Sequence, residues 1–226
     1  MLLLATDTSG KNGSLALAQT EAGGGALPIH IIEVVPLAGG TFSAQLVPQV
    51  SALLAKHGFT KNDIGAFVVT SGPGSFTGLR VGLAAIKALA EILGKPIAAV
   101  SLLEVIAVMS GLQGKVTALR DAGRGEVYVG EYEVAGESVR VVTERLLGKE
   151  EVWAGEALQL VTTDEDWLTG APAAGRAILK IDAVDAGTIA RVGWNRLLAG
   201  ETVAPEDLEA NYIRRSDAEI FAKNRL

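Results

Sequence analysis

The sequence predicts an α/β protein of two lobes that repeat one another, and three observations support this prediction. A short apolar run at 66–69 leads through a Gly-Pro-Gly turn into a long helical pattern, so that a strand is followed directly by a helix. Three apolar runs separated by turn signals come before it. Three strand patterns then recur in the second half, which indicates a first lobe at 1–100 and a second at 101–226.

The first lobe is predicted to run three strands, helix, strand, helix, strand. Apolar and β-branched runs bounded by glycine-containing turns predict strands at 2–5, 14–18, 29–35, 66–69 and 97–100. Helical spacing then places one group of residues on a common face: Leu46, Val50, Leu53, Leu54 and His57. This predicts a helix at 43–57 with Ser43 as its N-cap, although Pro48 would equally allow a start near Leu46. The second helix follows Gly74 and ends near Leu93.

The second lobe is predicted to repeat the three-strand opening. Ser101 with Glu104 three residues later forms a capping-box pattern for a helix through about Met109. Strands are predicted at 116–119, 127–132 and 139–147, and a helix at 185–198 that Gly200 ends. Between 150 and 181 the patterns are too weak to assign elements. The tail at 211–226 is polar, basic at Arg214 and Arg215, and predicted to be loosely held.

Composition excludes several classes of protein. The chain has 226 residues, of which 49% are hydrophobic, and no cysteine, so disulfides, thiolate zinc sites and a cysteine nucleophile are absent. A net charge of -6 argues against a domain that grips a nucleic-acid backbone by itself. The N-terminus has no basic region before an apolar core, and no segment reaches membrane-spanning length. We therefore expect a soluble cytoplasmic protein with no membrane contact.

Charge is distributed unevenly along the chain. Residues 1–100 carry six basic and five acidic side chains, whereas residues 101–226 carry fourteen and twenty-one. A soluble monomer needs a charged surface, so a first half this apolar is expected to cover part of its surface with a partner. A deeply buried lobe is the alternative explanation.

The Gly-Pro-Gly turn at Gly72, Pro73 and Gly74 has two interpretations. Backbone amides at the start of the following helix could hold a phosphate, but the segment matches neither a phosphate loop nor a dinucleotide fingerprint. A structural turn that docks a close-packed helix explains the same residues without a ligand. The helix carries a stripe of small residues three or four apart, so something must approach its backbone closely: Gly78, Gly82, Ala85 and Ala88.

The ionisable residues allow one enzymatic alternative. The two histidines, His30 and His57, lie in no metal-binding or triad pattern. Asp7 and Asp121 occupy equivalent strand ends of the two lobes, where a nucleotide-binding fold would hold magnesium-bound water. An autonomous ATP-dependent enzyme is therefore a second hypothesis, and simple turn hydrogen bonds explain Asp7 equally well. The residues that could face a nucleotide are Asp7, Thr8, Ser9, Gly72, Gly74, Asp121 and Arg124. No metal site is predicted.

Four motifs together resemble one bacterial family. They are L-L-A-T-D-T-S at the N-terminus, S-G-P-G-S-F-T-G-L-R-V-G at 71–82, D-A-G-R-G-E-V-Y at 121–128 and N-Y-I-R-R around Tyr212. The chain is similar in these motifs to the TsaB family, also called YeaZ and glycoprotease-like. The resemblance implies the two-lobed actin, sugar-kinase and Hsp70-like ATPase fold, with duplicated ribonuclease-H-like βββαβα lobes.

The resemblance also implies a role in making threonylcarbamoyladenosine beside the anticodon of ANN-decoding tRNAs. Family members are a non-catalytic scaffold required by a TsaD-like catalytic paralogue and a TsaE-like ATPase, and they are not proteases. The chain would then need no cofactor of its own, because ATP and a metal ion are used by the partner subunits, and it would meet tRNA only through the complex. A homodimeric interaction protein unrelated to tRNA is a third hypothesis.

The family resemblance implies pairing through the helices of the first lobe, as a homodimer when alone or as a heterodimer with the TsaD-like subunit. The predicted interface is Leu46, Val50, Leu53, Leu54, Gly78, Val81, Gly82, Ala85 and Leu89. A charge introduced by Val50→Glu or Ala85→Arg is expected to block pairing. One departure is Phe42, near a position where many relatives have histidine; here packing would replace polar contacts.

Overall fold

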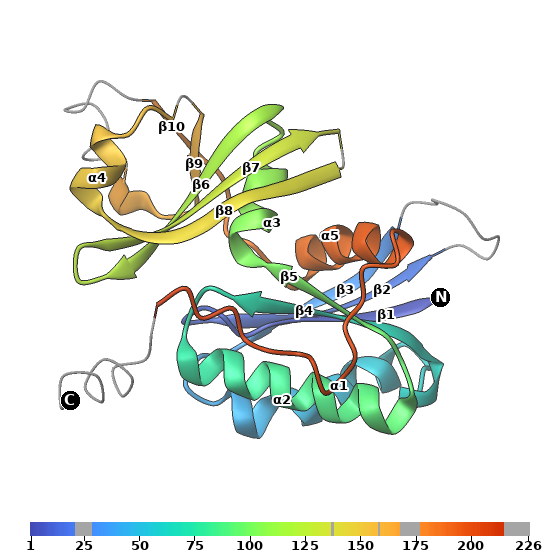
Figure 1. The fold of residues 1–226 in the computed structure, drawn as a ribbon. Coiled ribbons are helices and arrows are strands. Elements are labelled where there is room, and N and C mark those ends of the chain that lie inside the picture. The colour runs from blue at the N-terminus through green and yellow to red at the C-terminus, as the bar shows by residue number, and fades with distance from the viewer. Residues whose placement is uncertain (21–28, 137, 158, 168–176, 215–226) are drawn as a thin grey trace. The chain divides into compact units, whose positions relative to one another are not determined.

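The computed structural model describes residues 1–20, 29–136, 138–157, 159–167 and 177–214 (Figure 1). The chain divides into two compact units. The first consists of Met1–Leu102 and Val184–Ala210, and the second of Leu103–Ala183 with the segment that begins at Asn211. None of the helices within the described ranges is long and apolar enough to cross a membrane.

The first unit contains a five-stranded sheet in the order β3-β2-β1-β4-β5. Its strands are β1 (Leu2–Asp7), β2 (Gly13–Thr20), β3 (Ile29–Leu37), β4 (Ile64–Gly72) and β5 (Ile97–Ser101). The first three pair antiparallel, and β1, β4 and β5 run parallel. Because parallel strands are buried on both faces, β1 and β4 are almost continuous apolar runs. All five strands predicted for this lobe are confirmed.

Two helices cover one face of this sheet and a third covers the other (Figure 1). The helices α1 (Phe42–Lys56) and α2 (Phe76–Leu93) contact each other and bury their apolar stripes against the sheet. On the opposite face, α5 (Ala186–Leu198) contacts every strand of the sheet. Its first amide, on Ala186, donates a hydrogen bond of 2.8 Å to the Ser14 hydroxyl on β2.

The second unit repeats the same sheet. The strands are β6 (Gly114–Gly123), β7 (Glu126–Ala135), β8 (Ser138–Gly148), β9 (Leu160–Thr162) and β10 (Ile178–Lys180), in the order β10-β9-β6-β7-β8. The pairings β6–β7 and β7–β8 are antiparallel, and β6–β9 and β9–β10 are parallel. Each sheet thus has its third, second, first, fourth and fifth strands side by side in that order. The prediction of duplicated ribonuclease-H-like lobes is confirmed.

The predicted boundary between lobes needs a correction. The helix α3 (Leu102–Met109), which follows the fifth strand of the first sheet, packs in the second unit, and α5, which follows the fifth strand of the second sheet, packs in the first. The helix that follows the fifth strand of each sheet therefore belongs to the other unit. Assigning all of 101–226 to the second lobe was wrong for 184–210, because helix periodicity does not reveal which sheet an amphipathic helix covers.

Smaller differences lie at element ends and in one poorly patterned stretch. Helix α1 begins at Phe42 after Thr41, not after Ser43, and continues through the exposed Pro48. Short elements also form between 149 and 180, where none was predicted: α4 (Lys149–Ala154), β9, a 3-10 turn (Glu165–Trp167) and β10. They are too short to show a period. The predicted loose tail falls mostly on 215–226, outside the described residues.

One polar cluster fastens the end of α1 to the edge strand β3. Glu33 accepts hydrogen bonds from Lys56 Nζ at 2.7 Å, and its other oxygen lies 2.7 Å from His57 Nε2. The contact with Lys56, and then that with His57, lowers the pKa of Glu33 below its ordinary value of 4.5. A lowered pKa in the folded state means that the cluster stabilises the fold above pH 4.5 and loses this effect as the pH falls through the lowered pKa.

We therefore expect a pH-dependent difference between the wild type and Glu33→Gln. The melting temperature of the variant should be lower at pH 7, and the gap should close as the pH is lowered below 4.5 and through the lowered pKa of Glu33, because the wild-type carboxylate then becomes protonated. Thermal unfolding followed by circular dichroism at several pH values measures the gap. A gap that stays constant over this range would contradict the assignment.

Candidate functional site

The turn between β1 and β2 is closed against the start of α2. The hydroxyl of Thr8 donates a hydrogen bond of 2.7 Å to the carbonyl oxygen of Gly78, and the amide of Ser75 donates one of 2.7 Å to the carbonyl oxygen of Ser9. A Cβ atom on Gly78 would overlap the Thr8 carbonyl oxygen, and one on Gly82 would overlap the Thr8 hydroxyl. The small residues at these two positions therefore admit this turn, which is the close approach that the stripe predicted.

The nucleotide-facing residues that were predicted in the first unit lie in or beside this turn. Asp7, Thr8 and Ser9 are all buried, and one Asp7 carboxylate oxygen accepts a hydrogen bond of 2.9 Å from the Ser9 amide. Gly74 packs against the Ser9 carbonyl, and Gly72 is buried at the end of β4. Their contacts are those of a structural turn. Whether a residual nucleotide site survives stays a prediction.

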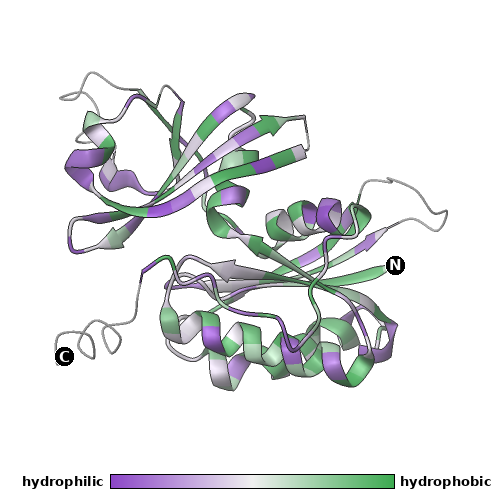
Figure 2. Ribbon diagram, viewed as in Figure 1, coloured by the Kyte–Doolittle hydropathy of each residue, from purple (hydrophilic) through white to green (hydrophobic). Residues whose placement is uncertain are grey.

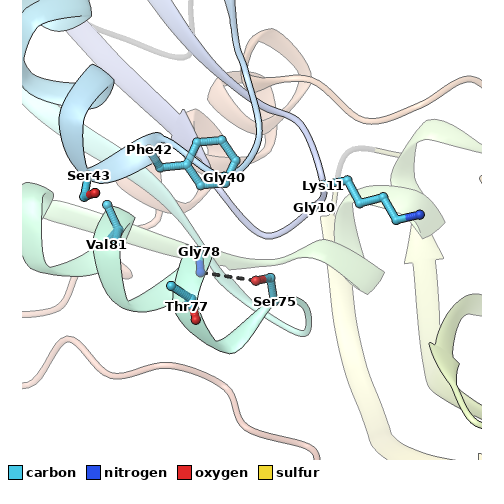
Figure 3. Close-up of a pocket in the computed structure, with 9 residues that line it drawn as sticks. All are labelled: Gly10, Lys11, Gly40, Phe42, Ser43, Ser75, Thr77, Gly78 and Val81. Carbon is cyan, nitrogen blue, oxygen red and sulfur yellow. Dashed lines mark hydrogen bonds between the residues drawn. The ribbon is translucent and has the colours of Figure 1, made fainter.

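A pocket of about 330 Å³ opens beside this turn, between the first turns of α1 and α2 (Figure 3). The ring of Phe42 lies over it, and Lys11 extends from the β1–β2 turn. Phe42 is buried and belongs to the core under the sheet, so packing does occupy this position as predicted. The lining residues carry hydroxyl groups and one amine but no carboxylate: Gly10, Lys11, Gly40, Phe42, Ser43, Ser75, Thr77, Gly78 and Val81.

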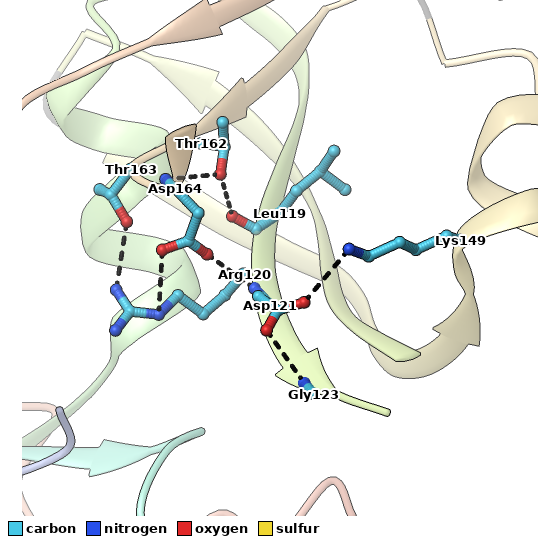
Figure 4. Close-up of polar contacts among 8 residues, drawn as sticks. All are labelled: Leu119, Arg120, Asp121, Gly123, Lys149, Thr162, Thr163 and Asp164. Carbon is cyan, nitrogen blue, oxygen red and sulfur yellow. Dashed lines mark hydrogen bonds and ion pairs between the residues drawn. The ribbon is translucent and has the colours of Figure 1, made fainter. Parts of the chain in front are cut away.

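The corresponding turn of the second unit is held by side chains (Figure 4). One carboxylate oxygen of Asp121 accepts a hydrogen bond of 3.1 Å from the Gly123 amide, and the other lies 3.6 Å from Lys149 Nζ. The Asp121 amide in turn donates to the Asp164 carboxylate at 2.7 Å. Asp121 therefore has structural partners for both oxygens. Within the described ranges, no three His, Asp or Glu side chains gather in a metal-binding arrangement.

Two residues of the last motif, N-Y-I-R-R, contact the sheet of the second unit. Asn211 donates a hydrogen bond of 2.5 Å to the Glu144 carboxylate, which also accepts one from the Tyr132 hydroxyl. Arg214 donates to the carbonyl oxygen of Ala122 at 2.8 Å and pairs with the Glu126 carboxylate. Arg214 thus contacts the β6–β7 hairpin on both sides of its turn. The sequence indicated this segment only as polar and basic.

The structure corrects most of the predicted partner interface. Six of its residues are buried inside the first unit, where they meet the sheet or Thr8 rather than solvent: Leu46, Val50, Leu53, Leu54, Gly78 and Gly82. They cannot form an exposed contact surface, so the prediction was wrong for them. Val50→Glu would accordingly bury a charge in the core of the lobe and would not test pairing. Val81, Ala85 and Leu89 are half-buried and remain accessible.

The apolar residues on the solvent-facing side of the same two helices were not predicted from the sequence. Val47 on α1 is 52% exposed and Ile92 on α2 is 74% exposed, and their neighbours Ala44, Ala84 and Ala88 are exposed too. No charged residue occurs in α1 before Lys56. Figure 2 shows apolar colour along much of these helices, interrupted by hydrophilic positions. Two features of the sequence could have indicated this exposed surface. They are the absence of charge along α1 and the apolar residues on the side of the helix opposite its buried stripe.

The model of the tRNA N6-adenosine threonylcarbamoyltransferase family, TsaD, matches residues 33–161, which is more than half of the chain. The matched region runs from β3 through the first sheet and into β9 of the second.

Similar proteins and structures agree with one another. The tRNA threonylcarbamoyladenosine biosynthesis protein TsaB of Bacillus subtilis is 35% identical over 134 residues, 59% of this chain and 56% of that protein. The match therefore spans little more than half the length of that protein. An uncharacterised protein of Mycobacterium tuberculosis is 33% identical over 79% of this chain and 77% of its own length. The solved structure of YeaZ from Pseudomonas aeruginosa is 26% identical, has a TM-score of 0.74, and covers 93% of this chain and 100% of its own.

Proposed function

Because the chain belongs to the TsaB (YeaZ) family, we propose that it acts in the biosynthesis of threonylcarbamoyladenosine in tRNA, as a non-catalytic scaffold. Its partners would be a TsaD-like catalytic paralogue and a TsaE-like ATPase, and it would reach tRNA only through their complex. The modified position would be the adenosine beside the anticodon of ANN-decoding tRNAs. Such a role would place the chain in the cytoplasm.

The outer side of α1 and α2 is the observation that carries the scaffold role. It combines two large exposed apolar side chains, Val47 and Ile92, with exposed alanines. On α1 this side carries no charge before Lys56, whereas α2 exposes Arg80 and Glu91 beside its alanines. Exposed apolar residues on a charge-depleted surface are typical of an interface core. Alanine side chains let two helix pairs approach closely, as packing between helices requires. We propose that this surface pairs with the TsaD-like subunit, or with a second copy of the chain when that subunit is absent.

The two closed turns support a role without chemistry. Asp7 and Asp121 are the residues that would hold a magnesium-bound nucleotide in a working ATPase of this fold. In this chain their carboxylates serve the turns themselves, through Ser9 in the first unit and through Gly123 and Lys149 in the second. ATP and a metal ion would then be used by the partner subunits and not by this chain.

Reconstitution tests the proposal directly. Threonylcarbamoyl transfer to unmodified tRNA is measured with the TsaD-like and TsaE-like proteins and the adenylate-forming enzyme, with and without this chain. We expect transfer only when the chain is present, and at least half of the wild-type rate with Asp7→Asn and with Asp121→Asn, because asparagine keeps a hydrogen-bond acceptor for both turns.

Two results would overturn it. If transfer is the same with and without the chain, the scaffold role fails. If the chain alone binds ATP saturably and Asp7→Asn abolishes both binding and transfer while its melting temperature stays unchanged, the chain is an ATP-dependent enzyme instead.

A further inference from the structure

One line of apolar residues on α2 remains accessible over most of the helix. The spacings along this line, which we call the α2 seam, are four, three and four residues, and its members are Val81, Ala85, Ala88 and Ile92. Alternating spacings of three and four place side chains on one line, as between two packed helices. Val81 and Ala85 are half-buried, Ala88 is exposed, and Ile92 is 74% exposed. The seam thus has the pattern of a helix-packing line, and its C-terminal part is open to solvent.

The order of side-chain sizes in the seam is the same from either end. Two large residues, Val81 and Ile92, enclose the small residues Ala85 and Ala88. Each large residue lies four positions from its nearer alanine, so an antiparallel copy of α2 sets large against large and small against small. Two crossing helices are closest at one point and diverge from it. Alanines at the centre allow the close approach, and the larger side chains, about 8 Å away on each side, fill the widening gap.

This pattern identifies the second helix as another copy of α2. A two-fold interface uses the same surface on both subunits, so the surface must be its own complement when one copy is reversed. The flanking charges agree with this pairing. Arg80 and Glu91 lie on one side of the seam near its opposite ends, so reversal brings each close to the other. Because Arg80 also has a contact within its own chain, the register rests on the apolar residues.

A second, independent feature lies at the N-terminal end of the seam. The pocket of about 330 Å³ between the first turns of α1 and α2 is lined by Val81 and by the ring of Phe42 (Figure 3). In the antiparallel pairing, Ile92 of the second copy lies opposite Val81 and therefore at this pocket. Ile92 is the most exposed of the large apolar side chains within the described ranges. The seam has a protruding side chain at one end and a hollow at the other, as a reciprocal contact requires.

We infer that two copies of the chain pair through antiparallel α2 helices, a conclusion that rests on the pairing surface of the function proposed above. Ile92 of each copy enters the pocket beside Val81 of the other. The two-fold axis passes between Ala85 and Ala88. Burial of the two isoleucine side chains, with the alanines in contact between them, supplies the apolar core of the interface.

Disulfide cross-linking tests the register, because the chain has no cysteine of its own. The full-length variants Val81→Cys and Ile92→Cys are purified separately, mixed and oxidised. We expect a covalent dimer in the mixture at a rate at least about 10-fold above that of either variant alone. In the antiparallel pairing, the two copies of position 81 lie about 16 Å apart along the helix axis, whereas a disulfide needs Cα atoms within about 7 Å.

The matched control replaces Val81→Cys by Thr77→Cys in the same mixture. Thr77 is exposed on α2 and lies four residues from Val81, so its cysteine is as accessible but out of register by about 6 Å. We expect this mixture to cross-link as slowly as the single variants. Circular dichroism confirms that all three variants are folded.

Shortening Ile92 tests the contact at the pocket. Ile92→Ala should weaken self-association of the full chain by about 10-fold or more, measured by sedimentation velocity over a range of concentrations. Its melting temperature should stay within about 2 °C of the wild type, because the side chain is exposed in the free chain. The control is Val142→Ala, which shortens an apolar side chain that is 49% exposed on β8 and should associate as the wild type does.

Three results would overturn the inference. They are a wild-type chain that stays monomeric at every concentration, rapid cross-linking of Val81→Cys alone, and unchanged self-association of Ile92→Ala. Failure of the proposed function would look different. Absence of threonylcarbamoyl transfer in the reconstitution, together with the disulfide between positions 81 and 92, would refute the scaffold role and still support the antiparallel pairing.

Discussion

Gly78→Ala is expected to destabilise the first lobe by about 2–3 kcal/mol, although alanine normally stabilises a helix relative to glycine. The new Cβ would overlap the backbone carbonyl oxygen of Thr8, and a backbone atom cannot move aside as a flexible side chain can. Relief requires the β1–β2 turn to leave the helix, which breaks the hydrogen bonds from Thr8 to Gly78 and from Ser75 to Ser9. Denaturant unfolding followed by circular dichroism measures the change.

The control is Ala84→Gly in the same helix. Ala84 is exposed, so removing its methyl group should cost only about 0.5–1 kcal/mol of helix propensity. Adding a methyl group at position 78 would then lower the free energy of unfolding more than removing one at position 84. A Gly78→Ala variant at least as stable as the wild type would show that the turn is not held against α2, and the argument that Asp7 is structural would lose its support.

The first lobe could be predicted in detail because each of its elements carries a local signal. The strands are apolar runs with turns at both ends, and Gly72 to Gly74 separate β4 from α2 by a change of period. The close approach to α2 was also predictable from the spacing of Gly78 and Gly82. What approaches was not: the contact joins Thr8 to Gly78 across 70 positions of sequence, and no local pattern records such a distance.

The errors share one physical cause, which is that amphipathicity shows that a face is buried but not what buries it. The stripe on α1 that includes Leu46 and Val50 meets the sheet of its own lobe, so reading it as a partner surface was wrong. The helix at 186–198 was assigned to the wrong lobe for the same reason. Apolar residues on the opposite side of α1, such as Val47, interrupt the period and were passed over, although they are the ones left exposed.

The second turn illustrates a further limit. The motif at 121–128 could be recognised from the sequence, and Asp121 and Arg124 could be named as candidates. The contacts of Asp121 and of the turn that follows it come from Lys149, Asp164 and Arg214, which lie in three distant segments. Backbone strain at Arg124 is likewise visible only once the φ angle is known. Motifs locate a site in this chain, and non-local contacts decide its chemistry.

Val47→Arg is expected to weaken association with the TsaD-like subunit strongly while leaving the lobe folded. Val47 is 52% exposed, so the longer side chain extends into solvent in the free chain and the melting temperature should change by less than about 2 °C. In a complex through α1 and α2 the same guanidinium would be buried in an apolar seam without a partner, which costs enough to weaken binding by about 100-fold, or about 3 kcal/mol. Size-exclusion chromatography of the mixed subunits and titration calorimetry measure the loss.

Val142→Arg is the matched control, because Val142 is 49% exposed but lies on β8 in the second unit, and it should bind as the wild type does. Normal binding by Val47→Arg together with a loss in Val142→Arg would move the interface to the second unit; equal losses in both would mean that nonspecific charge, rather than this surface, governs association.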